Sequence, residues 1–177
     1  MNAPEDPTGW TVRAATEADQ PAIRALVRSE KLNPTMLHWP TFVVAVTGPE
    51  IVGAAQIRRH EDGSRELGSI VVAPRYRGRG IAGRLVLTLL ASETGPVHVV
   101  TARARAERYR RFGFREIRPD QAPRRVRRNL RLGAFFGSAH SLLHGRLPIP
   151  LAILERSPPE VGDGVRSTTG VSTGRSR

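Results

Sequence analysis

Short hydrophobic stretches separated by turn-forming residues dominate the first half of the chain. Three of them, at residues 42–46, 51–57 and 66–72, are rich in valine and isoleucine, and Gly-Pro and Asp-Gly turns lie between them. This pattern predicts three consecutive antiparallel strands joined by short turns. Residues 10–14 alternate between apolar and polar side chains and predict a further strand.

Two segments have helical periodicity instead. Thr16 and Asp19 form a capping-box pattern before the first helix, and residues 81–91 place several leucines on one helical face. Residues 97–100 then predict a buried strand. Because a helix connects this strand to residues 66–72, we expect the two strands to run parallel. The remaining pattern predicts one short basic helix and two strands, at residues 104–112, 114–117 and 149–154.

These elements predict one domain with a mixed α/β sheet, antiparallel at first and parallel across the middle. A length of 177 residues fits a single domain. We place it at residues 10–156. Residues 1–9 are rich in proline and acidic side chains, and residues 157–177 hold three valines as their only apolar residues. Segments so poor in apolar groups do not offset their ordering entropy, so we expect two disordered tails.

Several functional classes are excluded by what the chain lacks. It has no cysteine, which excludes disulfide frameworks, cysteine zinc sites and thiol nucleophiles. No stretch approaches the ~20 apolar residues that span a bilayer. The acidic first residues do not resemble a secretory signal. We therefore expect a cytoplasmic protein without a membrane span.

The basic residues are concentrated in one part of the chain. Of 28 basic and 16 acidic residues, 17 and 5 lie within residues 65–131, so this segment carries a net charge equal to that of the whole chain, +12. Such a concentration predicts a polyanionic partner, which is a nucleic acid, an anionic lipid or a phosphate-rich ligand.

Glycine, arginine and the start of a helix coincide at residues 77–82, Arg-Gly-Arg-Gly-Ile-Ala. Glycines let backbone N–H groups approach a phosphate, and the helix N-terminus adds the positive end of its dipole. The segment therefore predicts a pyrophosphate site. Its glycines also fit G-x-G-x-x-G, but antiparallel strands precede them and the next strand does not end in an acidic residue, which argues against a dinucleotide fold.

Residues 77–82 resemble the Arg-x-x-Gly-x-Ala pyrophosphate signature of the GNAT superfamily of acyl-CoA-dependent N-acetyltransferases. One strand and one helix later, residues 109–114 match the Tyr-x-x-x-Gly-Phe signature that this superfamily has between a helix and a strand. The resemblance covers residues 10 to about 156. It implies a GNAT-like fold, in which helices flank a mixed central sheet and a parallel strand pair is splayed at the acyl-CoA cleft.

The resemblance also implies acetyl-CoA as the co-substrate and no metal. The residues expected to bind acetyl-CoA are Ile70, Val71, Val72, Arg77, Gly78, Arg79, Gly80, Ile81 and Ala82. The backbone near Val72 is a candidate for polarising the acyl carbonyl. One departure is Ala102, where many members carry an asparagine that contacts the cofactor, so some contacts to CoA must differ here.

Two residues are candidates for catalysis. Glu66 lies at the start of the strand before the motif, where the superfamily often places its base, acting directly or through water. Tyr109 is the candidate general acid, because a phenol with a pKa of ~10 can protonate a thiolate of similar basicity. The structural alternatives are that Glu66 is an ion-pair partner of Arg58 or Arg65, and that Tyr109 only packs between a helix and the sheet.

The predicted function is acetyl transfer to a primary amine of a small molecule, such as an amino acid. Direct attack within a ternary complex is expected, because no pair of residues suggests an activated nucleophile. In this superfamily the segment corresponding to residues 31–42 commonly covers the acceptor. Because it holds few acidic groups here and arginines lie close to Glu66 in sequence, we expect an amine with a carboxylate or an apolar body rather than a polycation.

The rival interpretation is a non-catalytic basic module that binds nucleic acid or an anionic membrane. The arginine-rich residues 124–131 have three possible interpretations: a solvated helix face, a lid over the acceptor pocket, or a helix that binds nucleic acid or a membrane surface. Nucleic acid is the weaker reading, because no DNA-reading motif accompanies them. His140 and His144 have a spacing seen in zinc sites but no third ligand. A candidate homodimer surface is formed by Phe135, Phe136, Leu142 and Leu143.

Overall fold

A seven-stranded mixed sheet organises the residues described by the computed structural model, which are 9–30, 35–132 and 149–158. Its strand order is β1-β2-β3-β4-β5-β7-β6. The strands are β1 (Thr11–Ala14), β2 (Phe42–Thr47), β3 (Glu50–Arg59), β4 (Arg65–Val72), β5 (Val97–Ala102), β6 (Arg115–Ile117) and β7 (Leu151–Arg156). The helices are α1 (Gln20–Ser29), α2 (Ile81–Ala91), α3 (Glu107–Arg110) and a helix over residues 124–132.

The sheet is splayed at its centre. Strands β4 and β5 run parallel, but they pair only at Arg65 with Val97 and at Glu66 with His98. Beyond these two positions β5 separates from β4. The opposite edge of β5 pairs with β7 along the whole strand. The predicted mixed sheet with a splayed parallel pair is confirmed.

A β-bulge lies in β4 beside this gap. Ala54 pairs with Val71 and Gln56 pairs with Gly68, so one residue of β3 faces two residues of β4. One of the two, Ser69, has a φ of +49°. Regular alternation would place Leu67 and Val71 on the same face, yet they belong to different core clusters. Because of the extra residue, odd-numbered side chains of β4 point to one face of the sheet before the bulge and to the opposite face after it.

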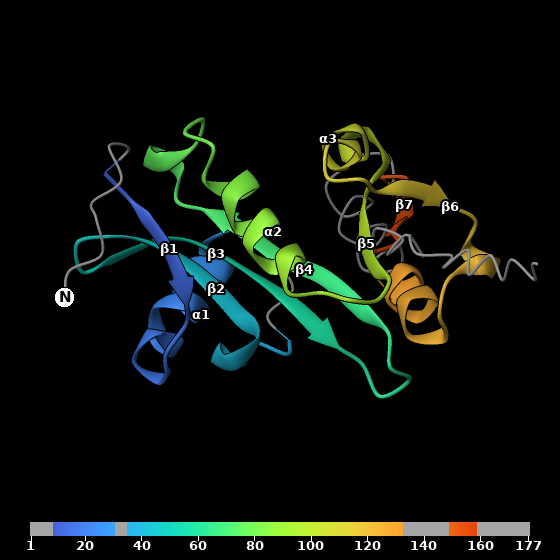
Figure 1. The fold of residues 1–177 in the computed structure, drawn as a ribbon, viewed down its shortest axis with the longest axis horizontal. Coiled ribbons are helices and arrows are strands. Elements are labelled where there is room, and N and C mark those ends of the chain that lie inside the picture. Colours follow the sequence, from blue (N-terminus) through green and yellow to red (C-terminus); the bar gives the residue numbers. More distant parts are fainter. Residues whose placement is uncertain (1–8, 31–34, 133–148, 159–177) are drawn as a thin grey trace, which may run out of the picture.

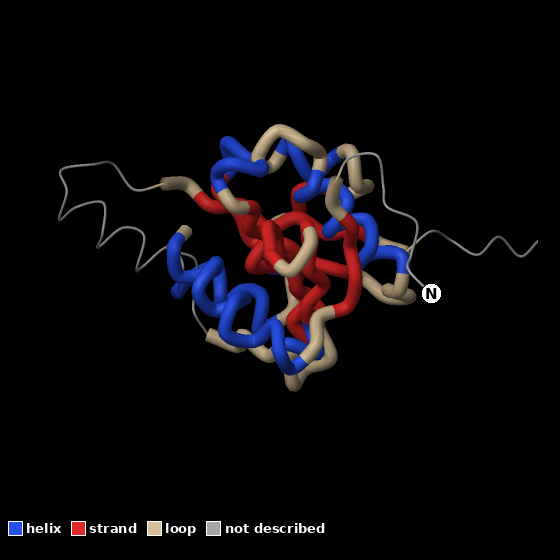
Figure 2. The backbone as a smooth tube through the Cα atoms, turned by 90° about the vertical axis from the view of Figure 1, so that its left-hand side faces the viewer, coloured by secondary structure: helices blue, strands red, loops and turns tan. Residues whose placement is uncertain are grey.

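Helices cover both faces of the sheet (Figures 1 and 2). Helix α2 packs on one face, with Leu85 and Leu89 in the larger core cluster, and Tyr109 of α3 packs against the same cluster. Helix α1 and the helix over residues 124–132 cover the opposite face, at two ends of the sheet. Among the described residues, no helix is long and apolar enough to cross a membrane.

Glycine at position 53 lets α2 approach the sheet. A Cβ atom there would lie 3.0 Å from Cγ2 of Ile81 and 3.2 Å from Cδ1 of Leu85. The first turn of α2 is thus held directly against β3. This contact fixes the position of the helix N-terminus that the sequence predicts to bind phosphate.

Most predicted boundaries agree with the structure to within a few residues. The carboxylate of Asp19 accepts a hydrogen bond from the N–H of Thr16, as the capping-box pattern predicts, and a second one from the Thr16 hydroxyl. The short basic helix differs most, because a 3-10 turn at Arg103–Arg105 precedes an α3 of four residues, Glu107–Arg110. The predicted tails fall almost entirely outside the described residues, as do the candidate dimer surface and the histidine pair.

Candidate active site

A cavity of about 480 Å³ opens beside the gap between β4 and β5. It is bounded by β4, by the motif before α2 and by α3. Five of the residues predicted to bind acetyl-CoA line this cavity together with Tyr109: Ile70, Val71, Val72, Arg77 and Ala82. The structure therefore places residues from two separate sequence motifs around one cavity.

The walls of this cavity are strongly basic. Among the described residues, its lining contains four arginines, Arg77, Arg105, Arg108 and Arg111, and one acidic residue, Glu30, which forms an ion pair with Arg77. The other three have no ion pair with any residue of the described ranges. A cavity with this surplus of positive charge suits a polyanionic ligand.

The N-terminus of α2 lies next to the cavity. Gly78 and Gly80 both have a φ of +80°, a conformation that glycine adopts without strain. Gly80 is the N-cap residue, and no side chain caps the helix, so the N–H groups of its first turn remain available. Ile81 is 1% exposed, and its side chain belongs to the core, so it can offer only its backbone N–H to a ligand. The guanidinium of Arg79 lies over the ring of Tyr76.

Tyr109 presents a half-buried phenol to the cavity. Its ring meets that of Phe114 edge-on, with 5.9 Å between the centroids. Burial raises the pKa of the Tyr109 hydroxyl above its usual value, although a hydrogen bond with Thr101 acts in the opposite direction. The hydroxyl therefore stays protonated at neutral pH and can donate a proton.

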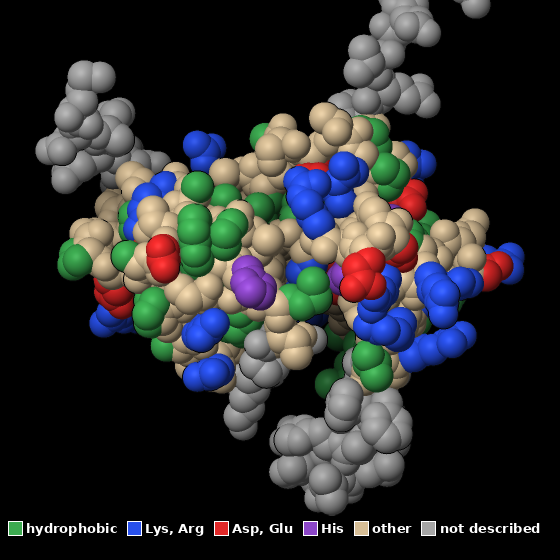
Figure 3. All heavy atoms as spheres, turned by 90° about the horizontal axis from the view of Figure 1, so that it is seen from below, with side chains coloured by type: hydrophobic (Ala, Val, Ile, Leu, Met, Phe, Trp, Pro, Cys, Tyr) green, Lys and Arg blue, Asp and Glu red, His purple; other side chains and the backbone are tan. Residues whose placement is uncertain are grey.

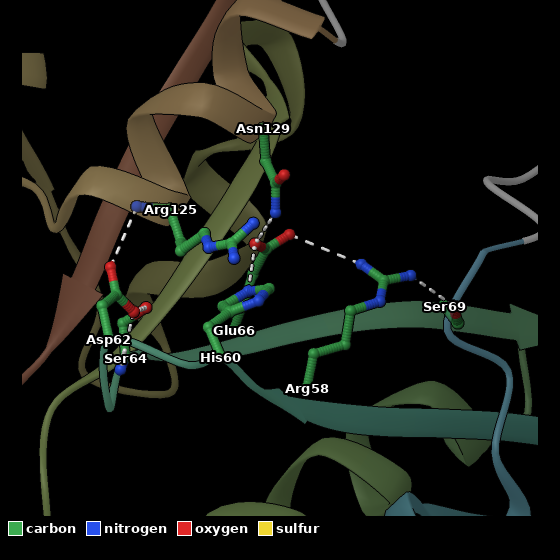
Figure 4. A network of polar contacts seen from close by, with 8 residues as sticks. All are labelled: Arg58, His60, Asp62, Ser64, Glu66, Ser69, Arg125 and Asn129. Carbon is green, nitrogen blue, oxygen red and sulfur yellow. Dashed lines mark hydrogen bonds and ion pairs between the residues drawn. The ribbon is translucent and has the colours of Figure 1, made fainter.

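Glu66 lies on the other face of the sheet, in a network of donors (Figure 4). It is 5% exposed. Its carboxylate is 2.6 Å from Nδ2 of Asn129, 3.1 Å from Nε2 of His60 and 3.4 Å from a guanidinium nitrogen of Arg58. Burial favours protonation, but the two hydrogen bonds and the Arg58 charge outweigh it and lower the pKa of Glu66. Glu66 is thus held as a carboxylate.

A row of polar side chains continues from Glu66 along this face. Arg58 donates a hydrogen bond of 2.8 Å to the hydroxyl of Ser69, the bulge residue. The Gln56 amide is 2.9 Å from the same hydroxyl and 3.0 Å from the hydroxyl of Thr41. Thr41 belongs to the segment expected to cover the acceptor, so this part of the segment does reach the polar row.

The two candidate catalytic residues lie on opposite faces of the sheet. Tyr109 packs against the cluster under α2, whereas Glu66 faces the helix over residues 124–132. The gap between β4 and β5 begins directly after Glu66. This arrangement allows one reactant to approach from each face and to meet the other in the gap.

Sequence analysis did not identify Asn129 and His60 as partners of Glu66. The alternation of side chains along a strand could have indicated His60. Arg58, which pairs with Glu66 across the turn, lies two positions before residue 60 and therefore on the same face. Asn129 carried only a weak signal, as a neutral side chain within an arginine-rich run. Arg65, considered as a partner of Glu66, instead pairs with the buried Glu93 at 2.9 Å.

Residues 38–116 match the family model of the acetyltransferase (GNAT) domain. These residues form a domain of the GNAT superfamily of acyl-CoA-dependent N-acetyltransferases. The matched region runs from just before β2 to β6, so it includes Glu66, the motif at residues 77–82 and Tyr109. Asn129 and its helix lie outside it. A search of curated proteins finds no match to the sequence.

Solved structures with a GNAT-like fold resemble this chain at low sequence identity. N-acetylglutamate synthase from Neisseria gonorrhoeae, complexed with coenzyme A and N-acetyl-glutamate, aligns with a TM-score of 0.64 and 20% identity over 84% of this chain. The chain spans only 35% of that protein's length. Rv2747 from Mycobacterium tuberculosis, in complex with CoA and NLQ, aligns with a TM-score of 0.60 and 23% identity, covering 83% of this chain and 98% of its own.

A third similar structure is the ribosomal-protein-S18-alanine N-acetyltransferase from Escherichia coli. It aligns with a TM-score of 0.60 and 14% identity, covering 88% of this chain and 98% of its own. The first of these structures contains N-acetyl-glutamate, whereas the third is named for an alanine of a ribosomal protein. The likeness therefore establishes the GNAT fold and leaves the acceptor to be argued from the site itself.

Proposed function

We propose that this protein transfers the acetyl group of acetyl-CoA to the primary amine of a small molecule, by direct attack within a ternary complex. The observation that carries the proposal is the basic cavity, which combines Tyr109, the β4 residues and the uncapped start of α2. The coenzyme A present in two of the similar structures supports acetyl-CoA as the donor.

The residues of the cavity fit an acyl-CoA molecule. The free N–H groups of α2 and the charge of Arg77 suit a pyrophosphate. Within the described residues, the edge of β4 beyond Glu66 has no strand partner on the β5 side, so its backbone groups near Ile70 and Val72 are available to a pantetheine arm and to the acyl carbonyl. Arg105, Arg108 and Arg111 supply further positive charge for phosphate groups.

The chemistry requires a proton to leave the amine and a proton to reach the thiolate. A C–N bond forms at the thioester carbon as the C–S bond breaks. Tyr109 supplies the proton to the sulfur. Because three donors surround Glu66 and lower its pKa, it is a weak base for direct abstraction. We therefore assign it to orienting the amine or a relaying water, through which the amine proton departs.

The acceptor we propose is an amine that carries a carboxylate or an apolar body, such as an amino acid. The acidic side chains near Glu66 are already engaged, since Glu61 pairs with Arg125 and Asp62 accepts bonds from Ser64 and from the N–H of Arg125. They are not free to hold the additional positive charges of a polycation. N-acetyl-glutamate in one of the similar structures is the acetylated form of such an amine.

Donor binding is tested by Gly80→Glu. The new carboxylate would stand at the helix N-terminus expected to hold the pyrophosphate, and we expect acetyl-CoA affinity to fall by at least 100-fold, about 2.7 kcal/mol, in isothermal titration calorimetry. Gly48→Glu is the matched control. Gly48 also has a positive φ, +53°, and at both positions an added Cβ meets no atom within 4 Å. Equal affinity of the two variants would contradict this donor site.

The acceptor class is tested by a panel of amines, followed through release of free CoA. We expect amino acids or arylamines to give higher kcat/KM values than spermidine. A tenfold advantage of spermidine over all of them, ~1.4 kcal/mol of transition-state preference, would contradict the proposed acceptor class. It would leave acetyl transfer itself intact.

A further inference from the structure

The outer side of the helix over residues 124–132 forms a second basic cavity. This cavity has a volume of about 700 Å³, and its lining contains five arginines together with Glu61 and Asp62. The arginines are Arg124, Arg125, Arg127, Arg128 and Arg131. Figure 3, which views the molecule from below, shows Lys and Arg side chains gathered beside acidic ones on the right-hand side of the surface. We call these five residues the arginine cluster.

Most of this charge has no counterion within the part of the chain that the structure describes. Arg125 pairs with Glu61, and the carboxylate of Asp62 accepts hydrogen bonds from Ser64 and from the N–H of Arg125. The other four members of the arginine cluster form no ion pair with any residue in the described ranges. The cavity therefore keeps a surplus of positive charge even though two carboxylates line it.

The position of the arginines on the helix makes the surplus unfavourable. Arg124 and Arg128 are four residues apart, as are Arg127 and Arg131, and like charges at this spacing repel each other. Arg124 and Arg125 also lie in the first turn, where the helix dipole favours negative charge. Asp62 already occupies the backbone N–H of Arg125, so a ligand would meet guanidinium groups rather than the helix end. A bound anion would relieve both effects.

We propose that the arginine cluster binds a small molecule that carries two or more phosphate or carboxylate groups. Guanidinium groups bind either kind of oxyanion through paired hydrogen bonds. A concave site with two carboxylates in its lining suits a compact anion better than a nucleic-acid strand, whose continuous phosphates would also meet Glu61 and Asp62. The site is separate from the acetyl-CoA cavity, because the two share no lining residue among those that the structure describes.

The arginine cluster is connected to Glu66 by two contacts. The helix that carries it also carries Asn129, which donates to Glu66 at 2.6 Å. The turn that holds Asp62 against this helix also carries His60, which contacts Glu66 at 3.1 Å. Figure 4 shows these side chains between the helix and the sheet. An anion bound to the arginine cluster would thus hold the helix that orients Glu66.

Calorimetry on the full chain saturated with CoA tests the proposal, with tripolyphosphate and citrate as probes. Saturation removes the phosphate site at α2 from the measurement. We expect one binding site for at least one probe, weakened at least tenfold in the double variant Arg124→Glu/Arg128→Glu. Glutamate at position 124 suits the helix dipole, so folding should be retained. Arg124→Gln/Arg128→Gln provides a milder second variant, expected to weaken binding in the same direction.

The matched control is Arg24→Glu/Arg28→Glu on α1. These arginines have the same spacing, are exposed, and form no ion pair within the described residues. Equal weakening in both double variants would overturn the proposal, as would the absence of binding at millimolar probe. Binding of a single-stranded oligonucleotide through the cluster, without binding of either small anion, would replace it with a nucleic-acid site. None of these results depends on catalytic activity.

Discussion

Replacement of Tyr109 by phenylalanine is expected to lower kcat by about 10²- to 10⁴-fold, the usual loss on removal of a general acid, and to change the KM for acetyl-CoA little. The substitution removes only the hydroxyl and keeps the edge-on contact with Phe114. Because burial raises the pKa of this hydroxyl, the wild-type acid remains protonated through neutral and mildly alkaline pH. An alkaline limb of kcat due to Tyr109 should therefore lie above about pH 10.

Tyr76→Phe is the matched control for this experiment. Tyr76 is the other tyrosine of the chain, and its hydroxyl is hydrogen-bonded to Glu50 at 3.1 Å. The Tyr76→Phe variant therefore lacks a phenolic hydroxyl that does not line the cavity. We expect its kcat to stay within a few-fold of the wild type. A Tyr109→Phe enzyme as active as Tyr76→Phe would show that Tyr109 only packs between helix and sheet.

Local features of the site could be predicted from the sequence because they depend on neighbouring residues. The glycines at 78 and 80 adopt positive φ values, and the helix that follows has the predicted limits of Ile81–Ala91. The parallel direction of β5 followed from its connection through a helix. None of these inferences required knowledge of how segments distant in the sequence pack together.

Features that depend on distant packing could not be predicted in this way. Strand β7 lies between β5 and β6, and nothing in the sequence of residues 149–154 specifies that position. The bulge at Ser69 was also missed, since its positive φ occurs at a residue other than glycine. The partners of Glu66 depend on both the register of the hairpin and the docking of the helix that carries Asn129.

Glu66→Gln is expected to lower both the free energy of unfolding and turnover. The amide removes the charge that faces the buried Arg58 and turns an NH₂ group toward a site surrounded by donors. Loss of one partner of a buried ion pair costs about 3–5 kcal/mol of stability. We expect kcat/KM to fall about 100-fold as well, because the amine or its relaying water loses a fixed carboxylate.

The stability loss should depend on pH with a definite sign. The pKa of Glu66 is lower in the folded protein than its ordinary value of about 4.3. Its contribution is therefore fully present above that ordinary value and is lost as the pH falls through the lower folded value. The difference in unfolding free energy between wild type and Glu66→Gln should be constant near neutral pH and shrink in acid, as measured by urea unfolding.

Glu155→Gln separates a catalytic role of Glu66 from a structural one. Glu155 is also hydrogen-bonded to a histidine, His98, at 3.0 Å, and the register places Glu66, His98 and Glu155 in one row across the sheet. Glu155 has no contact with Arg58, so its replacement should leave turnover unchanged. If Glu66→Gln lost stability but turned over like Glu155→Gln, then Glu66 would be the ion-pair partner of Arg58 and nothing more. The path of the amine proton would then have to be sought elsewhere around the gap between β4 and β5.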